Sequence, residues 1–251
     1  SLERRSGLMP VAFSSSSGDV KSGTATAGLD VKMASPAGSI SSGVIQAGRD
    51  VELLALGQVD VDSATAGRDL TVNSATAGVR AGTLRSGASL TIGAAQSIDI
   101  RNATAGGNLS LTSSRGRIDL GAGGAGGTAN LFGGQGVSVD QLDAANIALA
   151  SPGGDLNVGA LQAAGGEIAL NAGGDIGVGS AASRTFSASS SNASISVGSV
   201  SADEVTMTAP GEIAANALDV GRMVNLAGSR LAASIRATGS ADVGGLSLIH
   251  I

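Results

Sequence analysis

A column of polar residues is the feature of the sequence with the most obvious chemical potential. In seven repeats, one polar residue stands directly before an apolar run. The column consists of Asp30, Asp50, Asp69, Ser89, Asn108, Asn146 and Glu167. Carboxylates stacked about 4.8 Å apart could bind Ca²⁺, which prefers oxygen ligands. Asp, Asn and Ser also hydrogen-bond their own backbone at tight corners. Because Ser and Asn share the column with Asp, the pattern favours corner residues over a calcium site.

Two Gly-Gly-Asp segments, residues 153–156 and 173–176, are similar to part of the Gly/Asp-rich nonapeptide that binds calcium in secreted toxins. That motif needs tandem copies about nine residues long, with Gly and Asp on both sides. Here the two copies are 20 residues apart. The spacing therefore predicts turns at the same point of successive coils rather than a metal site.

Paired carboxylates, which general acid–base catalysis on polysaccharides requires, occur at Asp60 with Asp62 and at Asp140 with Asp143. Neither pair has an obvious basic neighbour at the equivalent position of an adjacent repeat, and the chain lacks Tyr and Trp to stack on sugars. The only His is His250 and Cys is absent, which excludes His-based triads and His or thiolate metal sites. We predict that the protein is not an enzyme and has no catalytic, cofactor-binding or metal residues.

Two further surface patterns concern the binding of a glycan and of ice. Arg49 and Arg68 lie one repeat apart and could meet a sulfated glycan. The same column continues with Ala88 and Gly107, which favours solvated side chains at a corner. A Thr-x-Thr column for ice binding is not formed by Thr24, Thr26, Thr65, Thr71, Thr91, Thr206 and Thr208.

The elements that position these residues come from an internal repeat of 19 to 20 residues. The tetrapeptide Ala-Thr-Ala-Gly occurs at residues 25–28, 64–67 and 103–106, each copy 39 residues after the last, and again out of phase at 75–78. Two apolar series keep the period. The first is Val31, Val51, Leu70, Leu90, Leu109, Ile147, Ile168, Val205 and Val224. The second is Ile40, Val59, Val79, Ile98, Ile118, Val137, Leu156, Ile176, Ile195 and Ile213.

Within each repeat, apolar and polar residues alternate, as in residues 69–73 and 97–101. This alternation predicts strands with one buried face. A third, shorter strand is expected at positions such as 43–45 and 82–84. The period is too short for a propeller blade and lacks a leucine-rich signature. We therefore predict an all-β fold, a parallel β-helix (solenoid) of about 11–12 coils with 19–20 residues each.

The composition supports a narrow aliphatic core. The chain has 40 Gly among 251 residues, no Trp or Tyr, and three Phe, while 42% of its residues are hydrophobic. A net charge of −5 argues against nucleic acid or an anionic membrane as a partner. No apolar run approaches the roughly 18 residues of a membrane helix, so no membrane span is expected.

The sequence divides into three parts. Residues 1–13 do not match the repeat and are interpreted as an irregular N-terminal segment or partial cap. Residues 14–245 form the β-helix repeat domain, and residues 246–251 are interpreted as a doubtful, non-native tail. Inside the domain the register loosens at residues 121–135, which are Gly-rich, and at residues 181–192, which are Ser-rich and include Phe186. Both segments predict loops or weakened coils.

The units at residues 47–51 (AGRDV) and 66–70 (AGRDL), with residues 106–109 (GGNL), resemble the haemagglutinin repeats of filamentous haemagglutinin-like exoproteins. The resemblance covers roughly residues 14–244. It implies a right-handed parallel β-helix within a very large protein that Gram-negative bacteria secrete by a two-partner route. The family's secretion domain has Asn-Pro motifs, and this chain contains no Asn-Pro dipeptide.

The resemblance implies a function as well as a fold. We expect a structural shaft segment of a secreted, surface-associated filamentous adhesin, attached to host cells or other surfaces. Its partners would be a host-cell receptor or glycan and, through a separate N-terminal domain, an outer-membrane transporter. Its location would be the bacterial surface or the extracellular medium, and no cofactor is expected. The alternative is the stalk of a contact-dependent growth-inhibition toxin, and the third and least favoured hypothesis is a carbohydrate-active β-helix enzyme.

Overall fold

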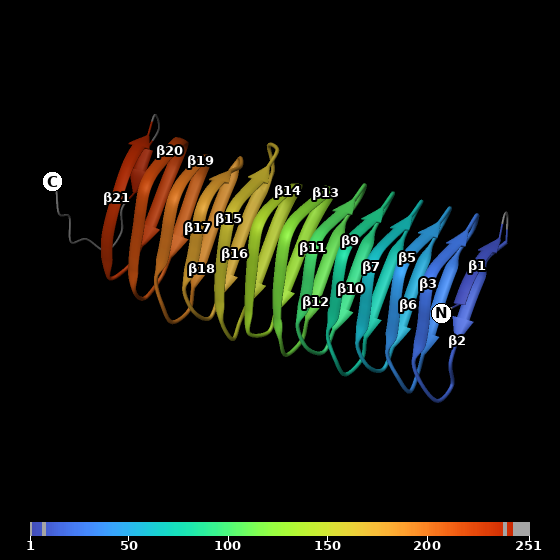
Figure 1. Cartoon of the computed structure of the whole chain (residues 1–251). Coiled ribbons are helices and arrows are strands. Elements are labelled where there is room, and N and C mark those ends of the chain that lie inside the picture. Colours follow the sequence, from blue (N-terminus) through green and yellow to red (C-terminus); the bar gives the residue numbers. More distant parts are fainter. Residues whose placement is uncertain (1, 7–8, 238–239, 243–251) are drawn as a thin grey trace. The chain divides into compact units, whose positions relative to one another are not determined.

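The structure is a computed structural model that describes residues 2–6, 9–237 and 240–242. The described residues form 22 strands and no helix. The chain divides into two compact units, Ser1–Gly127 and Thr128–Ile251. In each unit the strands stack in parallel as a β-solenoid, and the two units together contain about 12 turns (Figure 1). The predicted all-β, parallel solenoid is confirmed.

Unit 1 alternates long strands of eight residues with short strands of five. The long strands are β3 (Val20–Ala27), β5 (Ile40–Ala47), β7 (Val59–Ala66), β9 (Val79–Ser86) and β11 (Ile98–Ala105). The short strands are β4 (Val31–Ser35), β6 (Val51–Ala55), β8 (Leu70–Ser74), β10 (Leu90–Ala94) and β12 (Leu109–Ser113). β1 (Leu2–Ser6) and β2 (Val11–Ser14) precede them, and β13 (Arg117–Gly133) begins in this unit.

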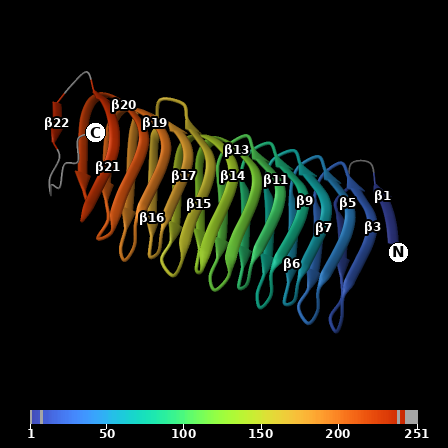
Figure 2. The same ribbon diagram turned by 60° about the vertical axis from the view of Figure 1, so that its left-hand side comes forward.

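Each strand of unit 1 pairs with the second strand along the chain, so that two strands make one coil. β7 pairs in parallel with β5 and β9, and β8 pairs in parallel with β6 and β10. Figure 2 shows the same succession of coils from another side. The pairing brings both predicted apolar series into line, with Val51 opposite Leu70 and Val59 opposite Val79. The predicted register is therefore confirmed within this unit.

Each long strand covers two faces of its coil. In β7, Val59 and Val61 are buried, and so are Ala64 and Ala66, while Asp62 between them is exposed. Strict alternation would bury residue 63, so the chain must turn a corner at 62–63 before its side chains point inward again. The third strand expected near residues 43–45 and 82–84 is accordingly the second half of β5 and β9 and not a separate element.

Unit 2 repeats the plan with longer strands. They are β14 (Gly136–Ser151), β15 (Asp155–Ala163), β16 (Glu167–Ala172), β17 (Ile176–Ala182), β18 (Thr185–Ser190), β19 (Ile195–Thr208), β20 (Glu212–Ala227), β21 (Arg230–Ala237) and β22 (Ser240–Asp242). The second apolar series again lies in register, from Val137 opposite Leu156 to Ile195 opposite Ile213. The first half of β14 pairs with β15 and its second half pairs with β16, so β14 covers every face of its coil.

Residues 121–133 and 185–190 of the two predicted loose segments lie in strands, so the prediction of loops is wrong for these residues, and the alternative of weakened coils stays a prediction. Residues 121–125 lie within β13, four of them opposite residues 102–105 of β11. In the second segment, Phe186 is fully buried in β18, between Ile168 and Val205 in the stack. Gly and Ser weaken the sequence signal, but the backbone groups of both segments still pair with the neighbouring coil.

Two strands lie within the segment 1–13 that the sequence analysis set apart. β1 pairs in parallel with β3, and β2 pairs with β4, with Val11 opposite Val31 and Val11 buried. Residues 246–251 lie outside the described part of the chain.

A column of glycines marks one corner of unit 1. It runs through Gly28, Gly48, Gly67, Gly87, Gly106 and Gly126, each directly after a long strand or its equivalent. A Cβ atom added to any of the last five would lie 2.1–2.2 Å from the carbonyl oxygen of the preceding glycine in the column. No side chain fits so close a backbone contact. This explains the Gly of the Ala-Gly pairs that follow β5, β7 and β11.

A second column, of Ser and Ala, explains the 39-residue period. The last residue of the short strands is in turn Ser35, Ala55, Ser74, Ala94 and Ser113. The hydroxyls of Ser35, Ser74 and Ser113 are buried and donate to the carbonyl oxygens of Gly18, Gly57 and Gln96 in the preceding coil, at 2.7–2.8 Å. Coils of 20 residues carry the Ser and coils of 19 residues carry the Ala, as the steps Val51 to Leu70 and Leu70 to Leu90 illustrate.

Ser74→Ala should destabilise the protein by about 1–3 kcal/mol, because it leaves the Gly57 carbonyl without its partner. The matched control is Ser151→Ala in unit 2, since the Ser151 hydroxyl is buried without a hydrogen-bond partner. Its removal should be neutral or stabilising. Urea unfolding followed by circular dichroism measures both, and equal losses for the two variants would contradict the hydrogen-bond explanation.

Candidate functional site

A ladder of charged residues crosses the glycine corner of unit 1. Arg49 donates two hydrogen bonds from its guanidinium to the carboxylate of Asp30, one of them at 2.7 Å, and Arg68 donates in the same way to Asp50, one of them at 2.9 Å. Each Arg also lies near the Asp that follows it, Arg49 at 3.7 Å from Asp50 and Arg68 at 3.3 Å from Asp69. Arg49 and Arg68 are half-exposed at this corner, as predicted, and they are also ion-paired, which the sequence did not reveal.

The Asp residues of this ladder also bind the backbone of the next coil. The carboxylate of Asp30 accepts the N–H of Asp50, Asp50 accepts that of Asp69, and Asp69 accepts that of Ser89, at 3.1–3.3 Å. These Asp residues stand at corners, as predicted, but the prediction that they hydrogen-bond their own backbone is wrong. Their carboxylates accept backbone N–H groups of the following coil instead. In unit 2, Asn146 does the same for Glu167.

These contacts explain each residue of the Ala-Gly-Arg-Asp-Leu unit. In residues 66–70 the Ala and Leu are buried, and the Gly allows close approach to the coil before. Arg68 holds the preceding Asp, while Asp69 holds the following backbone N–H. Repeating the unit in two successive coils is what builds the ladder.

The ion pairs shift the proton affinity of the Asp30 and Asp50 carboxylates. The hydrogen bond from Arg49 lowers the pKa of Asp30 below its ordinary value, against a smaller opposing effect of burial. The hydrogen bond from Arg68 lowers the pKa of Asp50 in the same way. Both carboxylates are therefore charged at neutral pH, which suits a stabilising clamp and not a general acid.

The two Gly-Gly-Asp segments form turns, as predicted. Asp155 accepts the backbone N–H of Asp175 at 2.8 Å, and Asp175 accepts that of Ser194 at 2.9 Å. These carboxylates repeat the clamp of unit 1 at another corner. Among the described residues, no three acidic, His or Cys side chains gather closely enough to hold a metal ion.

The carboxylate pair Asp60 and Asp62 has a basic neighbour that the sequence analysis missed. Arg80 is the register partner of Asp60 on one side and of Asp99 on the other, and it lies 3.7 Å from the Asp99 carboxylate. This alternation of charge makes an exposed ladder across β7, β9 and β11. Asp143 lies beside Gln162 of the next coil, and Asp140 occupies the corner position of β14.

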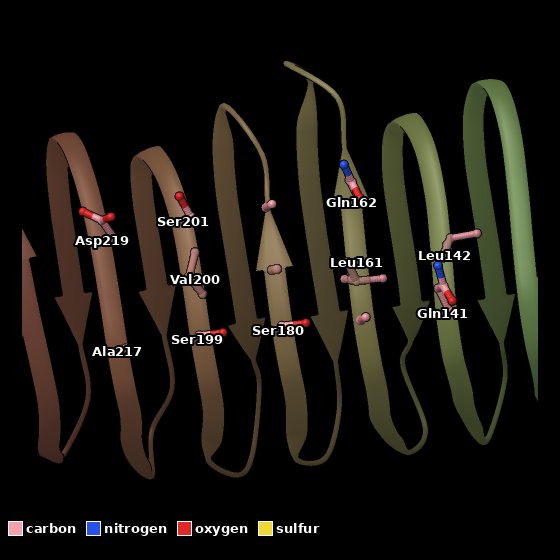
Figure 3. Close-up of a pocket in the computed structure, with 13 residues that line it drawn as sticks. Gln141, Leu142, Leu161, Gln162, Ser180, Ser199, Val200, Ser201, Ala217 and Asp219 are labelled. Atoms are coloured by element: carbon pink, nitrogen blue, oxygen red, sulfur yellow. The ribbon is translucent and has the colours of Figure 1, made fainter.

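A shallow groove lies on one face of unit 2 (Figure 3). Its volume is about 390 Å³, and five strands contribute to it, β14, β15, β17, β19 and β20. Two outward rows line it. One row is Gln141, Ala160, Ser180, Ser199 and Ala217, and the other includes Gln162, Ala182, Ser201 and Asp219. The small side chains in the middle of both rows leave the hollow.

The chemistry of this groove is that of hydrogen bonding without strong charge. Gln141 and Gln162 offer amides, Ser180 and Ser199 offer hydroxyls, and Asp219 is the one charged residue that lines it. Such groups can bind a neutral polar chain. No residue of the groove was predicted from the sequence as a site. The only available signal was the recurrence of small outward residues at one register position.

Comparison with protein-family models, with curated proteins and with solved structures finds no match to this chain. The part of the chain that the structure describes contains no helix able to cross a membrane.

Replacing Asp50 by Asn tests the charge of the clamp alone, because Asn keeps an oxygen that can accept the Asp69 N–H. A lowered pKa in the folded state stabilises the protein above the ordinary carboxyl pKa of 3.8 and loses this effect as the pH falls through the folded value. The loss caused by Asp50→Asn should therefore be largest at pH 7 and disappear near pH 2. It should also shrink in 1 M salt.

Urea unfolding at both pH values measures this effect, with Asp140→Asn at an exposed corner as the control. An Asp50→Asn loss that is the same at pH 7 and pH 2 would show that the ion pair with Arg68 adds nothing.

Proposed function

We propose that this chain is a shaft segment of a large, secreted, surface-associated filamentous adhesin that attaches to host cells or surfaces. The resemblance of its AGRDL-type units to haemagglutinin repeats supports this function, together with the solenoid fold. Export by an outer-membrane transporter and residence at the bacterial surface belong to the same proposal. The fold is compatible with such a shaft.

One observation carries the proposal: three kinds of recurring residue join one coil to the next. The Gly column, the buried Ser and the Arg–Asp clamp each make their contacts between neighbouring coils. A sequence with these repeats extends a stack by adding coils, because each pair of coils offers the next pair the same partners. Outward strand positions are free to vary, and a shaft of this kind can carry different surfaces on a constant frame.

The groove of unit 2 is the surface we propose for attachment, with a host receptor or glycan as the partner. Its amides and hydroxyls converge on one hollow, whereas the charged ladder of unit 1 is largely neutralised by its own ion pairs. A neutral polar ligand would meet hydrogen-bonding groups across several coils. It would displace water from small side chains at little cost in side-chain entropy.

Beads coated with the full chain should bind cultured epithelial cells in a specific and saturable manner. A double variant, Ser180→Lys and Ser199→Lys, should reduce binding roughly tenfold or more, because two long charged side chains fill the centre of the groove. Bead counts per cell over a range of coating densities give the measurement.

The matched control carries the same charge change on β18 and on the second half of β19, Ser187→Lys and Thr206→Lys. These residues lie side by side and face outward, away from the groove lining. Equal binding of the two double variants would remove the groove from the proposal. Wild-type binding no higher than that of beads coated with an unrelated protein would leave the segment as a spacer only.

A further inference from the structure

The second face of each coil in unit 1 is normally sealed by two buried side chains. These pairs are Ala25 with Ala27, Ile45 with Ala47, Ala64 with Ala66, Leu84 with Ser86 and Ala103 with Ala105, all at most 8% exposed. They stack in register from β3 to β11. Each coil therefore closes this face with side chains that no water reaches.

The coil formed by β13 departs from this rule. Gly123 stands opposite Ala103, and Ala125 stands opposite Ala105, but neither is buried. Every residue from 121 to 128 is half-buried or exposed, although the flanking Leu120 and Ala129 are buried. Leu120 fills the core at the first face, while the second face of this coil gains no large side chain.

The same seven residues, 121–127, include five glycines. Glycine gains more backbone freedom than any other residue when a strand opens, by about 0.5–1 kcal/mol relative to Ala. Their backbone hydrogen bonds to β11 are also poorly shielded, since no long side chain covers them on the outside. Few buried apolar contacts and exposed backbone bonds are the marks of a segment with low local stability.

We infer that residues 121–127, the glycine segment, are a built-in opening point, the segment of unit 1 whose hydrogen bonds to β11 break first. The segment forms regular structure at rest and opens locally under load or during attack by a protease, while β7–β12 stay closed. This inference goes beyond the proposed function and holds whether or not the chain is adhesive.

Hydrogen–deuterium exchange of the full chain, read by mass spectrometry, tests the inference directly. Amides of residues 117–127 should exchange roughly tenfold faster, or more, than those of β9 and β11 in the same molecule. Brief thermolysin treatment should place the first internal cut of unit 1 in this strand. Exchange of residues 117–127 as slow as that of β9 and β11 would overturn the inference.

The variant Gly124→Thr tests whether the glycines cause the low local stability of the segment. A Cβ at Gly124 would meet only the side chain of Thr104, at an ordinary 3.8 Å, and Thr favours strands. The substitution should slow exchange of the glycine segment roughly fivefold. Ala122→Thr, at the next outward position, is an independent second variant with the same expectation.

The matched control is Gly93→Thr in β10, another outward glycine, whose added Cβ would lie 3.4 Å from the Asn73 side chain. It should leave exchange of the glycine segment unchanged. If Gly93→Thr slows the segment as much as Gly124→Thr does, opening is global and the inference is overturned.

Discussion

The backbone of each coil must pair with the next coil at about 4.8 Å, and this spacing governs the other choices in the sequence. Where the chain rounds the corner after a long strand, a Cβ on Gly67 would lie 2.2 Å from the carbonyl oxygen of Gly48. Only glycine satisfies that contact. The same short spacing lets one carboxylate bridge two coils, as Asp50 does when it accepts both the side chain of Arg68 and the N–H of Asp69.

The narrow interior follows from the same constraint, because each coil must fill its own cross-section. Across the bend of four of the five long strands of unit 1, β5, β7, β9 and β11, a small buried residue accompanies a larger one three positions away. These pairs are Ser42 with Ile45, Val61 with Ala64, Ala81 with Leu84 and Ile100 with Ala103. The volumes compensate within a coil, so neighbouring coils can differ while the stack stays filled. In β13 the corresponding pair is Leu120 with Gly123. Gly123 has no side chain, and the second face of this coil is no longer sealed.

Sequence periodicity predicted the fold and the stacking register because buried positions repeat every 19 to 20 residues and alternate within strands. It did not predict the strands at residues 121–127 and at Phe186, since Gly and Ser carry no apolar signal even where their backbone pairs with the neighbouring coil. The partners of the polar residues were harder to predict. Whether Asp30 binds its own turn or the next coil depends on a register accurate to one residue. The groove depends on five strands at once, and no local pattern marks it.

Backbone pairing also explains why the true period is two coils. In the 20-residue coil, the carbonyl of Gly38 accepts the N–H of Gly57 from the next turn. In the shorter turn that follows, the carbonyl oxygen of Gly57 accepts a hydrogen bond from the hydroxyl of Ser74, one coil later. The alternation then repeats, with Ala77 accepting the N–H of Gln96 and Gln96 accepting the hydroxyl of Ser113. Adding a single coil would set two like turns side by side and leave one carbonyl unpaired. Unit 1 therefore grows without loss only by pairs of coils, which accounts for the 39-residue spacing of its Ala-Thr-Ala-Gly segments.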